Sequence, residues 1–262
     1  MDFFPTLPPQ AAVRLEPKQL FLQAHHIHHL GPESYEMTQF RRQAAALDEH
    51  VIIDNGAWEL KTPACDELYK VLDNFRLPAG LSADEVVCPD VFQDKDNTLQ
   101  MMEGHLKAIL GRARQVMLVP QGKDIIEWTG CLLSMHAYAR ASWRNGRVVL
   151  GIPKVVETYS GGRFGVCCWL EDHPELVPLG GVHLLGVWSE LDEIMALRGF
   201  DFIRSIDSTM PYAWALEGTI IQPHKVTPFK VEMTEKDWNH KPTHDELRRA
   251  EINIAIMKRI CR

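Results

Sequence analysis

Asp207 is the residue of this sequence that is best placed to do chemistry. It follows the short apolar run 200–203, which predicts a buried strand, and it precedes Ser208, Thr209 and the structure-breaking Pro211. Parallel strands of an α/β barrel present catalytic groups at their C-terminal ends. A carboxylate at such a place can act as a nucleophile or as a general acid or base. We therefore expect Asp207 to lie at a reaction centre.

Other predicted strands also end in polar residues or in glycine. If the strands form one barrel, these ends share one mouth. Asp and Gln side chains can recognise the donor and acceptor edge of a purine-like ring, and glycine lets a flat ligand approach the backbone closely. Two further carboxylates suit glycosidic chemistry, one as nucleophile and one as acid/base. The candidate residues, besides Asp207, are Asp54, Asn55, Gly56, Asp90, Gln121, Gly122, Gly151, Ile152, Leu185 and Gly186.

The elements that must position these residues alternate along the chain. Strand-like runs occur at 3–7, 20–24, 51–56, 85–90, 115–119, 147–153, 182–188 and 200–203. Helical patterns occupy 33–48, 64–75, 94–113, 124–144, part of 157–176, 189–198 and 243–261. Strands that alternate with helices indicate a parallel sheet. Seven or eight such units in 262 residues favour a closed barrel. The sequence therefore predicts an α/β fold, a single-domain (β/α)8 TIM-like barrel over 1–262.

Composition excludes several classes of protein. The formal net charge of −7 argues against a non-specific nucleic-acid coat, so any nucleic-acid contact needs a local basic patch. The six cysteines form no CxxC pair, which is typical of core residues in a reducing cytoplasm. We see neither a signal peptide nor an apolar run of membrane-spanning length, and we expect a cytoplasmic protein with no membrane partner. Phosphate-binding glycine motifs are missing from the expected places, so no nucleotide cofactor is indicated.

Taken in order, the strand-end motifs resemble those of the tRNA-guanine transglycosylase (queuine tRNA-ribosyltransferase) superfamily. Members of this superfamily exchange guanine for a 7-deazaguanine on a (β/α)8 barrel. Each match is short, but the ordered set covers nearly the whole chain. The matching segments are Ile53-Asp54-Asn55-Gly56-Ala57, Cys88-Pro89-Asp90, Val119-Pro120-Gln121-Gly122, Gly151-Ile152, Leu184-Leu185-Gly186-Val187 and Asp207-Ser208-Thr209-Met210-Pro211.

The resemblance implies a role for each matched residue. Asp207 would attack C1′ of the sugar and form a covalent glycosyl-enzyme, while Asp54 would act as general acid and base. Asp90 and Gln121, together with the backbone near Gly151 and Gly186, would hold either purine. One glycosidic bond is exchanged for another, so the resemblance implies neither a catalytic metal nor any other cofactor.

Two departures from the family narrow the expected substrate. Only Cys261 follows Asp207, so the cysteine cluster of the family's zinc-binding subdomain is missing. The basic residues that follow Met-Pro in the tRNA enzymes are replaced by the segment 212–216, Tyr-Ala-Trp-Ala-Leu. Compact, zinc-less relatives in phage and bacterial DNA modification insert 7-cyano-7-deazaguanine or a related base into DNA. The resemblance thus implies DNA and a free 7-deazaguanine base as partners, in the cytoplasm of a bacterium or a phage host. The alternative is exchange or base hydrolysis on tRNA or a nucleoside.

A histidine cluster supports a second alternative. His25, His26, His28 and His29 follow the predicted strand at 20–24. A histidine-x-histidine motif on the first barrel strand resembles the amidohydrolases, which bind one or two metals there and add a later His and a final Asp. His183 and Asp207 could fill those last places, which would give a metal-dependent hydrolase. Otherwise the cluster lines the pocket or lies in a solvated loop.

Overall fold

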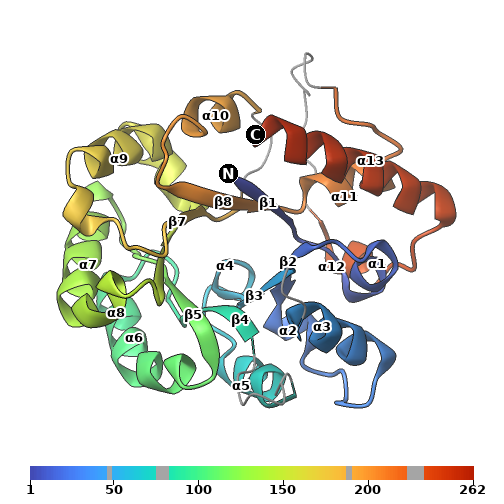
Figure 1. Ribbon diagram of the computed structural model, residues 1–262, viewed down its shortest axis with the longest axis horizontal. Helices are drawn as coiled ribbons and strands as arrows, with labels where there is room; N and C mark the ends of the chain where they lie inside the picture. The colour runs from blue at the N-terminus through green and yellow to red at the C-terminus, as the bar shows by residue number, and fades with distance from the viewer. Residues whose placement is uncertain (46–48, 75–82, 187–190, 223–232) are drawn as a thin grey trace.

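The chain forms a nearly closed barrel of parallel strands, surrounded by a ring of helices (Figure 1). The computed structural model describes residues 1–45, 49–74, 83–186, 191–222 and 233–262. In these residues the sheet has eight strands in the order β1-β8-β7-β6-β5-β4-β3-β2. A single parallel bridge between Thr6 and Phe21 links the two ends of the sheet. The predicted (β/α)8 TIM-like architecture is confirmed.

The strands are short and lie in parallel register. Gln23 of β2 lies opposite Asp54 of β3, and Phe4 of β1 lies opposite Asp207 of β8, so these side chains start from neighbouring strands. The strands are β1 (Asp2–Pro5), β2 (Gln19–Gln23), β3 (His50–Asp54), β4 (Ala83–Val87), β5 (Ala113–Leu118), β6 (Val148–Ile152), β7 (Val182–Leu184) and β8 (Ile203–Ser208).

The outer helices follow the strands in the expected order. Several have clear start signals, such as the Asp94 side chain that caps α6 and the Thr243–Glu246 capping box of α13. The α-helices are α1 (Pro9–Leu15), α2 (Ala24–Ile27), α3 (Tyr35–Ala45), α4 (Ala57–Leu60), α5 (Cys65–Asn74), α6 (Lys95–Leu110), α7 (Ile125–Tyr138), α8 (Arg140–Arg144), α9 (Gly162–Glu171), α10 (Leu191–Leu197), α11 (Met210–Leu216), α12 (Glu235–Trp238) and α13 (His244–Ile260). Two 3-10 helices, η1 (Lys154–Thr158) and η2 (Pro174–Leu176), flank α9.

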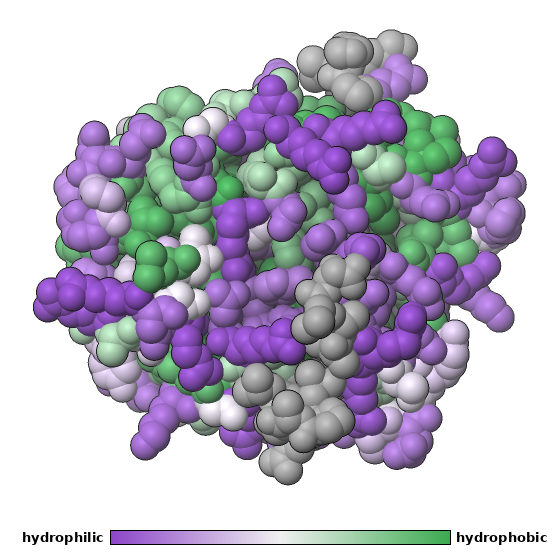
Figure 2. Space-filling view, in the orientation of Figure 1, coloured by the Kyte–Doolittle hydropathy of each residue, from purple (hydrophilic) through white to green (hydrophobic). Residues whose placement is uncertain are grey.

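Two cores hold the barrel together. The larger core fills the space between the sheet and the helices. The face of the molecule in Figure 2 mixes hydrophilic with hydrophobic residues. The smaller core lies inside the barrel, where inward-pointing side chains from several strands pack together. Its members are Phe4, Phe21, Ile52, Val87, Met117, Val119 and Val149.

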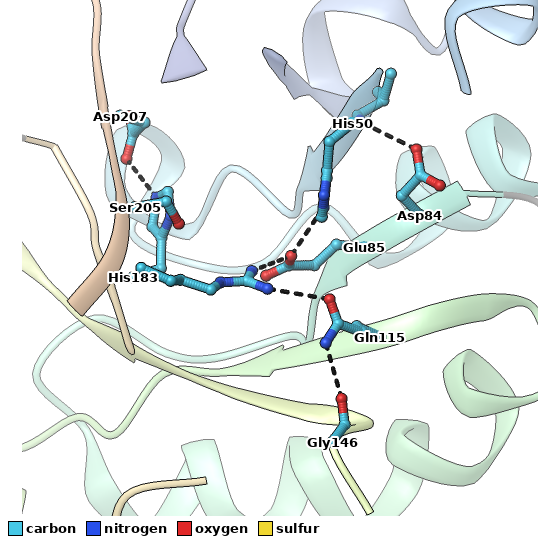
Figure 3. A network of polar contacts seen from close by, with 10 residues as sticks. His50, Asp84, Glu85, Gln115, Gly146, His183, Ser205 and Asp207 are labelled. Carbon is cyan, nitrogen blue, oxygen red and sulfur yellow. Dashed lines mark hydrogen bonds and ion pairs between the residues drawn. The ribbon is translucent and has the colours of Figure 1, made fainter. Parts of the chain in front are cut away.

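A charged network lies inside the barrel near the N-terminal ends of the strands (Figure 3). The buried Glu85 carboxylate accepts from Arg204 and lies 3.1 Å from His50 Nε2. Arg204 also donates to Gln115 Oε1 at 3.0 Å. The Arg204 charge, with help from His50, outweighs burial and lowers the Glu85 pKa to about 2. Barrel enzymes place their chemistry at the opposite end, so we assign this network to stability.

The strand before Asp207 is displaced from the predicted position. The run 200–203 is wrong as a strand, because β8 spans Ile203–Ser208 and Asp207 lies within it, near its C-terminal end. Phe200 and Phe202 precede the strand and pack on each other with ring centroids 5.4 Å apart. The register shifts at Val182/His183, so that β8 contributes one extra residue at this point. Hydrophobicity alone does not distinguish such a packed turn from a strand.

Three other element predictions need correction. The helix predicted over 124–144 is interrupted at Ala139, which ends α7 and precedes α8. The strand predicted over 182–188 ends at Leu184, and Val187 and Trp188 lie outside the described residues. The segment 157–176 contains the end of η1, then α9 and the whole of η2. No helix among the described residues has the length and apolar character needed to span a membrane.

Candidate active site

A cavity of about 420 Å³ opens at the C-terminal ends of the strands. Four carboxyl groups line it, from Asp54, Glu59, Asp90 and Asp207. The barrel therefore brings the three acids predicted at strand ends into one cavity and adds a fourth, Glu59. Its wall also includes the predicted residues Gln121, Leu185 and Gly186.

Asp207 is held in place by three donors. Its Oδ1 accepts from the Gly186 backbone N–H at 2.9 Å and lies 3.2 Å from His183 Nε2. Its Oδ2 accepts from the Thr6 hydroxyl at 3.0 Å. The residue is only 6% exposed, and it lines the cavity. Donors on both oxygens fix the orientation of the carboxylate, which is what an attacking group requires.

His183 lies beneath Asp207 in the barrel interior (Figure 3). Its Nδ1 lies 2.8 Å from the Ser205 hydroxyl, and its ring is fully buried. Phe21 stacks on the ring and Phe4 meets it edge-on, each with centroids 5.9 Å away. Since Ser205 engages Nδ1, the other ring nitrogen is directed at Asp207. His183 is thus a buried support for the carboxylate.

The Gly186 donor is itself anchored from outside the barrel. Gly186 has a φ of 65°, a conformation that glycine adopts without the steric cost of a side chain. Arg163 of α9 is buried and donates to the neighbouring Leu185 carbonyl at 2.9 Å. Glu157 and Glu193 pair with the same guanidinium. The buried Arg163, held by these two carboxylates, thus fixes the backbone that contacts Asp207.

Asp54 ends β3 and is half-buried in the cavity wall. Its Oδ2 accepts from the Gly56 N–H at 3.1 Å. Burial, followed by the charges of Glu59, Asp90 and Asp207, raises the Asp54 pKa well above its ordinary value. A carboxyl group with a raised pKa holds its proton more tightly and can act as a general acid.

Asp90 forms a second polar wall with two amides. Asn55 Nδ2 donates to Oδ1 at 2.8 Å, and Gln121 Nε2 donates to Oδ2 at 2.6 Å. Gln121 Oε1 in turn accepts from the Gln93 N–H at 3.1 Å. Burial raises the Asp90 pKa to about 6, although both amide donors act in the opposite direction. This wall presents a carboxyl group and an amide to the cavity, which suits the polar edge of a planar heterocycle.

Five of the predicted residues lie behind the cavity wall. Asn55 is fully buried and links Asp90 to the Cys88 carbonyl. Gly56, with a φ of 75°, has no room for a Cβ against the His25 ring. A Cβ on Gly122 would meet the α7 backbone at 2.5 Å, and one on Gly151 would meet Val119 Cγ2 at 2.8 Å. Ile152 points into the outer core. The three glycines among them allow close packing of the segments that support the cavity wall.

The mouth of the cavity is aromatic and cationic. Lys61 Nζ lies 4.4 Å from the Trp58 ring centroid and 4.1 Å from that of Phe92. The two rings meet edge-on with centroids 5.1 Å apart. Lys154 and Trp238 also line the cavity. Aromatic faces and lysines at an opening are suited to a base and its phosphate backbone.

The histidine cluster lies just outside the cavity. His25 and His26 belong to the short helix α2, and His26 stacks on Trp238 with centroids 4.2 Å apart. His28 Nδ1 lies 2.8 Å from the His25 carbonyl oxygen. In the part of the chain that the structure describes, no three His, Cys, Asp or Glu side chains are grouped to hold a metal ion. No observation on these residues favours the metal-dependent alternative.

Sequence reasoning missed several residues that line the cavity, among them three that contact or neighbour its acids, and it weighed His183 only as a metal ligand. Thr6, Gln23 and Glu59 come from three separate segments. Thr6 follows β1 and Gln23 ends β2, so the rule that strand ends carry the chemistry could have found both. Glu59 lies on α4, where a polar residue is more often solvated.

Comparisons with known proteins identify no relative, so the function of the site is inferred from its geometry. No protein-family model matches the chain, and no curated protein matches it either.

Proposed function

We propose that this protein is a base-exchange glycosyltransferase, a pentosyltransferase that replaces guanine in DNA with a 7-deazaguanine such as 7-cyano-7-deazaguanine. The observation that carries the proposal is the pairing of Asp207 and Asp54 in one cavity with the Asp90–Gln121 wall. This set provides a nucleophile, a proton donor and a purine-recognising surface. The resemblance to the zinc-less transglycosylases is the reason for proposing DNA as the substrate polymer.

The proposed reaction has two displacement steps. The Asp207 carboxylate attacks C1′, the C1′–N9 bond breaks, and its electron pair leaves with guanine while Asp54 supplies a proton. Asp207 is then esterified to the sugar. In the second step Asp54 takes the N9 proton of the incoming base, whose nitrogen attacks C1′ and releases Asp207. The proton returns to Asp54, so one turnover consumes neither water nor an energy source.

Each group of site residues has a role in these steps. Thr6, His183 and Gly186 orient Asp207 toward the sugar. The raised Asp54 pKa keeps a proton available for the departing base. Asp90 and Gln121 hold the departing and the incoming base in the same place. A guanine in duplex DNA must be flipped out of the stack to enter the cavity.

Labelled guanine tests both the reaction and the polymer. We would incubate the protein with radiolabelled guanine and, in parallel, duplex DNA, tRNA or free guanosine. Label in DNA is the expected result, whereas label in tRNA or guanosine alone would replace DNA by one of those alternatives. Release of guanine without incorporation would indicate hydrolysis.

The Asp207→Asn variant tests the covalent step. It keeps the size of the side chain and removes the attacking carboxylate, so we expect loss of exchange and of any protein–DNA adduct trapped in denaturant. Turnover by Asp207→Asn at the wild-type rate would remove Asp207 as the nucleophile. The variant Asp96→Asn, which changes an exposed acid on α6, is the matched control and should keep full activity.

A further inference from the structure

Glu59 is a cavity acid that the reaction described above does not use. It lies on α4, five residues after Asp54, and lines the same cavity as Asp54 and Asp207. Gln23 Nε2 donates to Glu59 Oε1 at 2.5 Å. Gln23 is itself opposite Asp54 in the β2–β3 register. The Gln23 side chain therefore holds the Glu59 carboxyl over the end of β3, beside Asp54.

The charged groups around this pair come from every neighbouring element. Asp90, which follows β4, and Asp207 on β8 line the same cavity as Asp54 and raise its pKa through their charge, and Lys61 follows α4. His25 of α2 lies against Gly56, and burial lowers its pKa, so its neutral form is favoured. Lys154 of η1 also lines the cavity, but no hydrogen bond or ion pair among the described residues joins a cation to Asp54. Among the charges that act on Asp54, that of Glu59 raises its pKa the most.

The pKa values of Glu59 and Asp54 are both raised. Glu59 is an exposed residue of α4, but its carboxyl group faces the cavity, where loss of solvent raises its pKa to about 7, with Gln23 and Lys61 acting in the opposite direction. The Asp54 pKa is also raised well above its ordinary value, first by burial and then by Glu59. Two nearby carboxyl groups resist double ionisation, so a charged Glu59 favours the neutral form of its neighbour.

We propose that Glu59 is a positioning residue for the acid–base step, with its carboxylate fixed by Gln23 so that its charge retains the proton on Asp54. The inference rests on the proposed base exchange for its catalytic meaning. Asp54 gives its proton to the base nitrogen as the C1′–N9 bond breaks and regains one from the incoming base. Glu59 exchanges no proton in this cycle, because it acts only through its charge.

The pH dependence of single-turnover exchange tests this role. In Glu59→Gln the side chain keeps its size and an oxygen that can accept from Gln23, but it loses the charge. We expect the basic limb of the profile to move to lower pH by about 1 unit, the lower end of the effect of a nearby charge. Above that limb the variant should be about tenfold slower than the wild type, and below it the two rates should converge. Glu59→Asp keeps the charge and should retain the wild-type basic limb.

The matched control is Glu103→Gln, which removes an exposed carboxylate on α6. Its profile should match that of the wild type. A Glu59→Gln rate that falls by the same factor at every pH would indicate a structural role only and would overturn the inference.

A second measurement separates this inference from the proposed function. Carbon-13 NMR of the side-chain carboxyl groups, assigned with Asp54→Asn, gives the titration midpoint of Asp54 without any substrate. We expect a midpoint about 1 unit lower in Glu59→Gln than in the wild type. If the midpoint shifts but the wild type exchanges no base, the coupling stands and the proposed function fails. If the wild type exchanges bases but the midpoint does not move, the function stands and the role of Glu59 is refuted.

Discussion

The buried Asp90 should make the protein less stable as the pH rises, and Asp90→Asn should remove this effect. Asp90 is 5% exposed, and burial raises its pKa from 3.8 to about 6 in the folded protein. Between these two values the folded state binds more protons than the unfolded state. Stability then falls as pH rises, because the folded protein must hold a charge that its surroundings disfavour.

The size of the effect follows from that pKa difference. A change of about 2 units corresponds to about 3 kcal/mol when the group titrates fully in both states. Between about pH 4.5 and pH 7.5 roughly 2 kcal/mol of this should appear, since part of the unfolded-state titration lies below that window. An asparagine cannot take up the charge, so the variant lacks this loss.

The measurement is urea unfolding of the wild type and of Asp90→Asn at both pH values. From the lower to the higher pH, the free energy of unfolding of the variant should rise by about 2 kcal/mol relative to that of the wild type. Comparing the two pH values cancels the constant cost of presenting the introduced amide to two amide donors, Asn55 and Gln121. Parallel stability curves would refute the reasoning, because they would mean that Asp90 titrates as an ordinary carboxyl. The same variant should lose guanine binding, since the Asp90 carboxylate is the proposed acceptor for the base.

Two further substitutions test the support of the site. Thr6→Val keeps the shape of the side chain but removes the hydroxyl that donates to Asp207 Oδ2. We expect the rate of single-turnover exchange to fall about tenfold, because a hydrogen bond to a charged group contributes roughly 1.5 kcal/mol. A full wild-type rate would show that this donor is dispensable. Gly151→Ala places a Cβ 2.8 Å from Val119 Cγ2 and 2.9 Å from Met117 Sδ. This overpacking should lower the free energy of unfolding in urea by about 1–3 kcal/mol. An unchanged unfolding midpoint would show that the barrel interior can relax.

The alternation of strands and helices along the chain is enough to determine the fold class. Apolar runs such as 51–53, followed by amphipathic segments such as 64–75, lead to a parallel sheet because each strand needs a crossover before the next. The prediction failed where the same residue types serve two purposes. Phe200 and Phe202 pack in a turn before β8, although their sequence pattern is also that of a strand.

The candidate site was only partly accessible to sequence reasoning. The acids Asp54, Asp90 and Asp207 stand near strand ends, and the rule that parallel strands present their chemistry there brings them together. Gly122 and Gly151 have the residue type expected for a ligand contact, yet their missing Cβ atoms make room for α7 and for Val119. A glycine in the sequence does not reveal which neighbour needs the space.

By itself, the sequence determined the barrel and the acids that end its strands, because periodicity and strand order are local properties of the chain. The tertiary structure alone decided which groups act on those acids. Thr6, His183 and Gly186 reach Asp207 from three segments, and Glu59 meets Gln23 across a gap of 36 residues. Burial and charge–charge distances set the pKa of a carboxyl, and both depend on groups that the chain brings together only when it folds.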